Sequence, residues 1–203
     1  MEWLGLLMLV VLAVQGINRM EQAGRVALLA QHLSRFHVEN LMGQLTEGYL
    51  RALDTTDADR RRQLWGALES MEQELSRQFS AFAEAFAKVY GGHTLVSRLP
   101  FALPRATQLF PKATIDLRQL LGLHARGIAD VVANQAGRSQ RDKAYTLTAE
   151  LYLMQHSCQW FCRSKNTASA RLLARHKTSY QQVLGAVSEG TRRAYTALVG
   201  VAG

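Results

Sequence analysis

Residues 64–89 read LWGALESMEQELSRQFSAFAEAFAKV. Within this segment, large apolar residues follow one another at intervals of three or four positions, at Leu64, Leu68, Met71, Leu75, Phe79, Phe82, Phe86 and Val89. Since one α-helical turn spans about 3.6 residues, these side chains share one helical face. The spacing therefore predicts a long amphipathic helix that ends at Gly91–Gly92, and it makes the phenylalanines core side chains rather than a cofactor-binding set.

A second apolar stripe of mostly helical spacing lies before this helix, from Val26 to Tyr49. It predicts one helix that continues from the N-terminal segment to about Leu53, where residues 54–57 stop it. Thr56 is the expected N-cap of the next helix, because acidic residues follow it in the first turn. Two long helices joined by so short a link predict an antiparallel hairpin of coiled-coil type over residues 19–92.

The N-terminus is almost purely apolar, because every residue from Trp3 to Val14 is apolar or glycine and the run extends to Ile17. Fifteen helical residues reach about 22 Å, against a hydrocarbon core of about 30 Å, so the length is borderline for a transmembrane helix. We interpret residues 1–18 as a membrane anchor, with a buried core helix and a cleaved signal peptide as alternatives. The predicted anchor residues are Trp3, Leu4, Leu7, Leu9, Val10, Leu12 and Ile17.

The charges around this run predict its orientation. Glu2 precedes the run where a signal peptide would carry a positive charge, whereas Arg19, Arg25 and Arg35 follow it. By the positive-inside rule, the N-terminus then lies outside and the remaining chain lies in the cytoplasm. The expected location is the inner membrane of a bacterium.

All three prolines, Pro100, Pro104 and Pro111, fall within a dozen residues and predict an irregular connector over residues 93–112. Downstream, apolar residues return at helical spacing, and no run shows strand alternation bounded by turns. The sequence thus predicts an all-α fold of six or seven helices. Its expected parts are the anchor 1–18, the hairpin 19–92, the connector 93–112 and a smaller helical module 113–203.

Positive charge concentrates in the C-terminal half of the chain. The formal net charge is +8, but residues 93–203 alone hold 15 basic and 5 acidic residues. Such an excess attracts polyanions, among them anionic lipid, nucleic acid and acidic proteins, although a plain solvated surface is the alternative. The basic residues of the predicted binding patch are Arg138, Arg141, Lys143, Arg163, Lys165, Arg171, Arg175, Lys177, Arg192 and Arg193.

Cys158 and Cys162 form the one cluster of soft ligands in the chain. Four positions apart on a predicted helix, they share a face that suits one Zn²⁺ ion or thiol redox chemistry. His156 lies on the far side of the same helix and does not complete the pair. Because both cysteines also continue an apolar stripe, inert core thiols are the favoured interpretation, and the sequence predicts no cofactor.

Three functional hypotheses follow from these features. The first is a single-pass, membrane-anchored adaptor or accessory subunit. Its basic cytoplasmic module binds an anionic partner or membrane surface, and its hairpin pairs with another protein or a second copy of the chain. The second is a soluble or peripheral nucleic-acid-binding protein, although no known nucleic-acid-binding motif is present. The third is a thiol- or metal-dependent enzyme at Cys158 and Cys162, for which the sequence offers no catalytic constellation.

Overall fold

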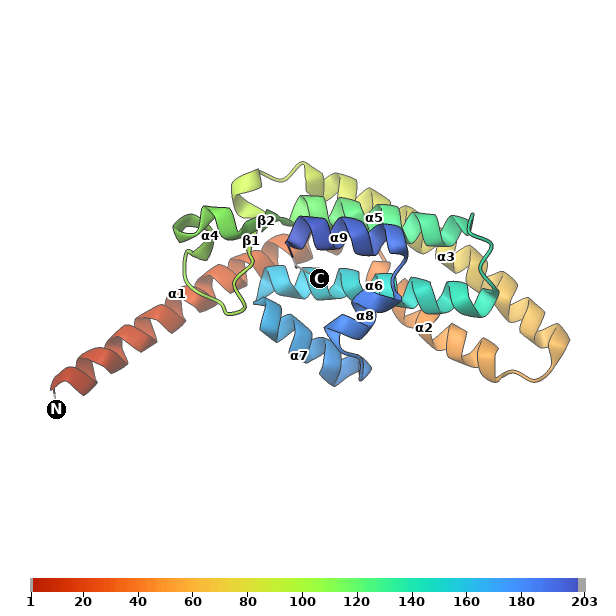
Figure 1. Ribbon diagram of the computed structural model, residues 1–203, viewed down its shortest axis with the longest axis horizontal. Coiled ribbons are helices and arrows are strands. Elements are labelled where there is room, and N and C mark those ends of the chain that lie inside the picture. The colour runs from red at the N-terminus through yellow and green to blue at the C-terminus, as the bar shows by residue number, and fades with distance from the viewer. Residues whose placement is uncertain (1, 201–203) are drawn as a thin grey trace.

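A computed structural model describes residues 2–200 of the chain, with all their side chains except those of Glu2 and Leu4. It is predominantly helical, which confirms the all-α prediction (Figure 1). The longer helices are α1 (Glu2–Leu33), α2 (Val38–Asp54), α3 (Ala58–Ala87), α5 (Leu117–Ala133), α6 (Gln140–Cys162), α7 (Lys165–His176), α8 (Tyr180–Ala186) and α9 (Glu189–Val199). The shorter elements are η1 (Gly91–His93), β1 (Leu95–Ser97), α4 (Ala106–Leu109), η2 (Pro111–Ala113) and β2 (Thr114–Asp116).

The predicted apolar face of α3 is confirmed. Leu75, Phe79, Phe82 and Phe86 are fully buried, and the stripe faces the common core. The helix begins one residue later than its predicted cap, because the side chain of Asp57, rather than that of Thr56, accepts a hydrogen bond from the Arg60 amide at 2.8 Å. This shift of the N-cap by one residue does not change which side chains of α3 lie on its apolar face.

The predicted continuous helix from the N-terminus to Leu53 is wrong, because the chain breaks at residues 34–37 into α1 and α2. Phe36 lies in this break and packs edge-on against Phe82, with ring centroids 5.9 Å apart. The His37 amide donates a hydrogen bond to Gln78 Oε1 on α3 at 3.1 Å. These contacts with α3 replace the helical continuation that the apolar spacing suggested.

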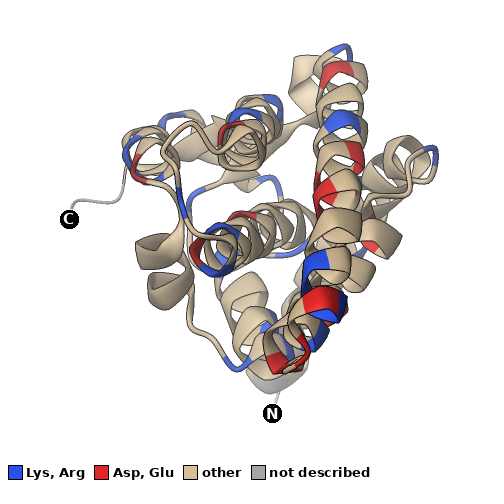
Figure 2. Cartoon of the chain, turned by 90° about the vertical axis from the view of Figure 1, so that its right-hand side faces the viewer, with Lys and Arg blue, Asp and Glu red and all other residues tan. Residues whose placement is uncertain are grey.

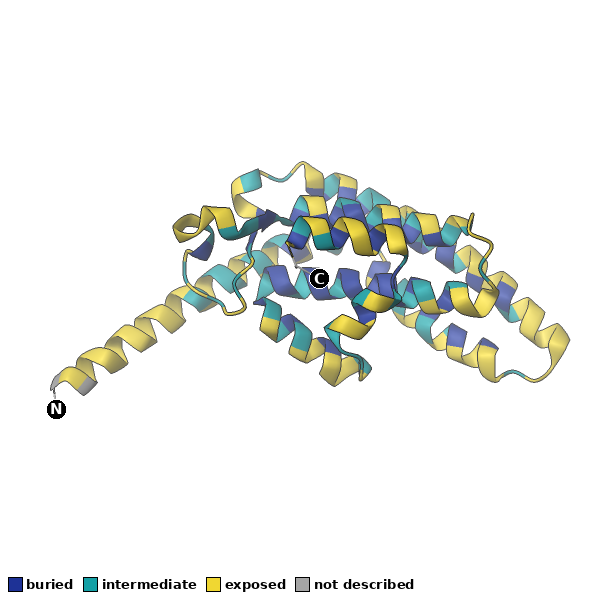
Figure 3. Cartoon of the chain, in the orientation of Figure 1, coloured by how far each residue is buried: buried dark blue, intermediate teal, exposed yellow. Residues whose placement is uncertain are grey.

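Helix α6 is the centre of the molecule. It packs against α5, α7 and α8, and also contacts α1 and α2, while α5 packs between α6 and α3. Leu147, Leu151, Leu153 and Phe161 of α6 are fully buried (Figure 3). One shared core therefore joins the α2–α3 hairpin to the C-terminal helices.

A small antiparallel sheet formed by β1 and β2 was not predicted from the sequence. Val96 pairs with Ile115, and both side chains are buried. Each strand is only three residues long, which is too short for alternation to stand out from the irregular connector. The pair joins the two ends of the connector and fixes it as a closed loop on the body.

Candidate functional site: an apolar arm and the surface at its base

Residues 3–17 of α1, called here the apolar arm, project from the body (Figure 1). Every described side chain of the arm is exposed, from Trp3 at 83% to Val14 at 38% (Figure 3). Of the predicted anchor residues, Trp3, Leu7, Leu9, Val10, Leu12 and Ile17 are exposed, and the Leu4 side chain lies outside the described residues. Apolar surface of this extent is rare on soluble monomers and marks an interaction site.

In the part of the chain whose side chains are described, no helix combines the length and the apolar character needed to cross a bilayer.

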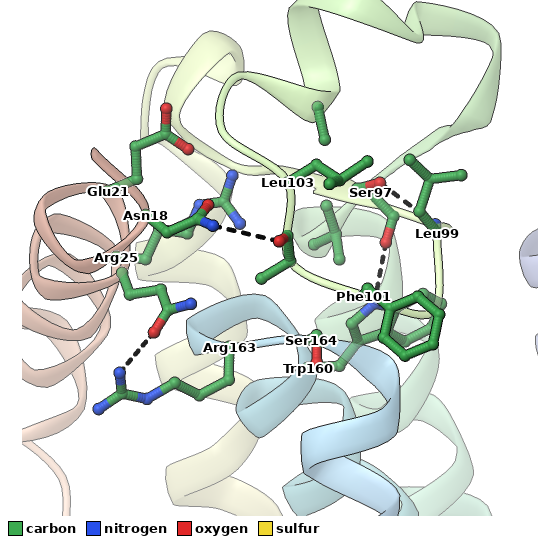
Figure 4. A pocket seen from close by; sticks show the side chains of 14 residues that line it. Asn18, Glu21, Arg25, Ser97, Leu99, Phe101, Leu103, Trp160, Arg163 and Ser164 are labelled. Atoms are coloured by element: carbon green, nitrogen blue, oxygen red, sulfur yellow. Dashed lines mark hydrogen bonds between the residues drawn. The ribbon is translucent and has the colours of Figure 1, made fainter. Parts of the chain in front are cut away.

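The arm leaves the body beside the connector. Asn18 Nδ2, one position beyond the arm, donates a hydrogen bond to the Ala102 carbonyl oxygen at 3.2 Å (Figure 4). One turn further on, Glu21 accepts a hydrogen bond from the Arg105 amide at 3.0 Å. These two contacts hold the connector against α1 at the point where its exposed segment begins.

The end of α6 supports the same region from the opposite side. Arg163 Nη1 donates to Gln22 Oε1 of α1 at 2.5 Å, and the Trp160 indole donates to the Ser97 carbonyl at 2.9 Å (Figure 4). Between these contacts lies a cavity of about 20 Å³. A space of this size accommodates a single water molecule, so it is packing at the base of the arm rather than a ligand site.

The ten residues of the predicted basic patch are not brought onto one face. Arg141 lies at the start of α6 and Arg163 follows its end, and the 23 residues of this helix separate them by about 33 Å. Figure 2 shows Lys and Arg on several helices, interleaved with Asp and Glu. The exposed members are Arg141 on α6, Arg171 and Arg175 on α7 with Lys177 just after it, and Arg192 and Arg193 on α9.

Three predicted patch residues make contacts within the protein instead. Lys143 Nζ lies 2.6 Å from Glu72 Oε2, and the lysine side chain is only 12% exposed. Arg163 contacts α1, as described above, and the Lys165 ammonium lies 5.3 Å from the ring centroids of both Trp160 and Tyr180. Arg138 is half-buried in the turn after α5. Polyanion binding therefore stays a prediction for the exposed bases alone.

Cys158 and Cys162 lie half-buried on α6 as free thiols. Burial raises the pKa of Cys158 to about 12, and Cys162 and Glu39 add to this shift. Burial also raises the pKa of Cys162, against the opposing effect of Arg163, Arg25 and Arg171. Among the described residues, no three His, Cys, Asp or Glu side chains are grouped to hold a metal ion.

We expect both thiols to react slowly in the folded protein, because the thiolate is the reactive species and burial disfavours it. Dithionitrobenzoate should modify the native chain on the order of a hundredfold more slowly than the denatured chain, in which both thiols react. Rapid modification of a thiol in the native chain would contradict this burial.

A buried polar cluster that was not predicted from the sequence joins α5, α6 and α9. His124 Nε2 lies 2.8 Å from Ser157 Oγ, and the His124 ring lies 5.8 Å from that of Tyr195. Both histidine and serine are completely buried. Burial, with a smaller contribution from His156, lowers the pKa of His124 to about 3.

The cluster continues toward α7 and α8. His156 Nε2 lies 3.0 Å from Ser169 Oγ, and its ring packs 4.7 Å from the Tyr180 ring. Burial, together with the nearby charge of Lys165, lowers the pKa of His156 to about 4. Both imidazoles are therefore neutral at physiological pH and act as internal hydrogen-bonding groups. Helical spacing alone gives no signal for this arrangement, because the partners come from five helices.

No protein-family model matches this chain, and no curated protein and no solved structure matches it at a significant level.

Proposed function

We propose that this protein is a membrane-anchored helical adaptor, in which the apolar arm inserts into a bilayer and the helical body lies at the membrane surface. The observation that carries the proposal is that every described side chain of the arm is exposed, including its large apolar ones. A helix that is apolar on all sides is favourable only when its whole circumference is buried, and lipid provides this.

The arm suits a single short membrane segment. At about 1.5 Å per residue its fifteen residues reach about 22 Å, so crossing the bilayer requires local thinning or help from flanking side chains. Trp3 at one end suits a membrane interface, and Arg19 beyond the other end suits the headgroups. We propose that the N-terminus lies outside the bacterial inner membrane and that the body lies in the cytoplasm.

Two surface features support an adaptor role for the body. A groove of about 520 Å³ runs between α2 and α6, and its lining includes the exposed apolar side chains of Leu50, Leu53 and Tyr145. These residues make the α2 side of the hairpin, together with α6, a site for a protein partner or a second copy. The exposed bases Arg171 and Arg175, one turn apart on α7, supply a contact for an anionic partner.

Cell fractionation tests the anchor. The full chain should stay with membranes through high-salt and alkaline carbonate washes, because apolar insertion resists both. The double variant Leu9→Lys and Leu12→Lys should be released, since each lysine near the centre of the segment opposes insertion by about 3 kcal/mol.

The matched control places the same two lysines at exposed leucines of the body, Leu50→Lys and Leu173→Lys, and should stay in the membrane fraction. Release of the unmodified chain by salt or carbonate would overturn the proposal. Nucleic-acid binding by residues 93–203 would then be the next hypothesis to test.

A further inference from the structure

The connector presents a row of large apolar side chains to the outside. Phe101 is 65% and Leu109 is 66% exposed, and Leu103 and Phe110 are each nearly half exposed. The connector is nevertheless well held: the Asn166 amide donates to the Pro100 carbonyl at 3.2 Å, and the β1–β2 pair closes the loop. Its apolar side chains are thus displayed by a fixed backbone rather than by a loose one.

Charge in the same segment has one sign. Residues 93–112 contain no Asp or Glu, and Arg98, Arg105 and Lys112 are all exposed. Arg19, also exposed, follows the arm at the level of the connector. The Glu21 carboxylate of α1 lies against the Arg105 amide, so the bases remain in excess rather than alone. Exposed apolar side chains next to an excess of bases are the composition of a surface that binds the headgroup region of an anionic membrane.

The position of the connector determines which membrane it meets. Asn18 and Glu21 of α1 contact the connector backbone at Ala102 and Arg105, immediately beyond the exposed arm. Figures 1 and 4 show the connector and α4 beside α1 at this point. When the arm enters a bilayer along its axis, the connector is the first part of the body to reach the same bilayer.

We propose that the connector is a second membrane contact, which places Phe101, Leu103, Leu109 and Phe110 in the interface of the anionic bilayer that the arm enters. Arg105 and Lys112 then meet lipid phosphates. This inference rests on the proposed membrane function and adds to it that the body is docked on the bilayer rather than suspended from it. The apolar side chains of the connector lie beside the end of the short arm, so they extend the apolar surface that the protein presents to the bilayer.

The test uses the full chain in vesicles of phosphatidylethanolamine and phosphatidylglycerol, with an environment-sensitive fluorophore on one introduced cysteine at a time. The labelled positions are Val14→Cys in the arm, Leu109→Cys in the connector and Leu173→Cys on α7 as the control. Lipids with a quencher near the headgroup or deep in the acyl chain report depth. We expect deep quenching at position 14, shallow quenching with a blue-shifted emission at position 109, and neither at position 173.

The outcomes separate the two proposals. Quenching at position 14 without quenching at 109 overturns the connector contact and leaves the anchor intact. Quenching at position 109 without quenching at 14 supports the connector contact and overturns the anchor. Quenching at neither position overturns both proposals.

A binding measurement gives a second, independent readout. In the full chain carrying Leu9→Lys and Leu12→Lys, the connector alone should still bind phosphatidylglycerol vesicles, and Phe101→Ser with Leu109→Ser should weaken this binding at least about tenfold. Leu50→Ser with Leu173→Ser removes similarly exposed apolar side chains elsewhere and should leave binding unchanged. Equal binding by both serine variants would overturn the connector contact.

Discussion

Replacing Glu72 with alanine is expected to destabilise the folded protein by about 3 to 5 kcal/mol, because it leaves a buried ammonium without its counter-charge. Glu72 is 3% exposed and lies between two helices: Lys143 Nζ of α6 is 2.6 Å from one carboxylate oxygen, and Tyr49 of α2 donates its hydroxyl to the other at 2.7 Å. One carboxylate therefore joins α2, α3 and α6, which form the connection between the hairpin and the rest of the body.

Urea unfolding of the full chain in a mild detergent, followed by circular dichroism, measures this loss as a shift in midpoint. Asp59→Ala is the matched control, because it removes the carboxylate partner of Arg62 at the surface of the same helix, where both side chains are about 80% exposed. It should change stability by less than about 1 kcal/mol. The double variant Glu72→Met and Lys143→Met should recover most of the loss, since it leaves neither charge unpaired. A Glu72→Ala chain as stable as the Asp59→Ala chain would contradict the buried pair.

The sequence predicted the apolar core well and the buried polar contacts poorly. The stripe of α3 could be read directly, because burial of Leu75, Phe79 and Phe86 follows from their spacing along one helix. Glu72 lies among them and looks like one member of a solvated charged face. Its burial depends on Lys143, which is distant in sequence, and spacing along one helix carries no information about such a partner.

The candidate site, too, could be predicted from the sequence only in part. The apolar character of the arm is a local property of residues 3–17, so the sequence was sufficient to find it. The connector was predicted only as an irregular segment that packs onto the protein. That it lies beside Asn18, with Phe101 and Leu109 facing outward, depends on hydrogen bonds across 84 positions of the chain. The ten predicted basic residues do not form one patch. Net charge along a sequence does not specify which bases form ion pairs inside the protein, as Lys143 does with Glu72.

Acid is expected to destabilise the protein already in the pH range in which unfolded histidines take up protons. Burial lowers the pKa of His124 to about 3 and that of His156 to about 4 in the folded state, whereas both return to about 6.5 in the unfolded chain. Below pH 6.5 the unfolded state therefore binds protons that the folded state does not. The stability contributed by the neutral imidazoles is present above pH 6.5 and decreases as the pH falls toward the folded values.

The expected slope is about 1.4 kcal/mol per pH unit for each histidine, so the two together should cost about 4 kcal/mol by pH 5. Glu150 acts in the opposite direction, because burial raises its pKa and the folded state then binds a proton more readily than the unfolded state. One carboxyl group can offset the titration of at most one of the two histidines, so Glu150 reduces the slope without reversing it.

Urea midpoints measured between pH 7 and pH 5 test this slope, and variants identify its source. The double variant His124→Gln and His156→Gln should be less stable at neutral pH, because it loses the hydrogen bonds to Ser157 and Ser169. Its stability should fall less steeply than that of the parent over the same interval, although His176 remains, whose pKa burial also lowers. His93→Gln, at an exposed histidine, should keep the full slope. Because the two imidazoles connect α5 and α6 with α7, α8 and α9, their protonation should loosen the C-terminal helices together. If the stability of the unmodified chain falls no more steeply with pH than that of the double variant, the acid sensitivity has another source.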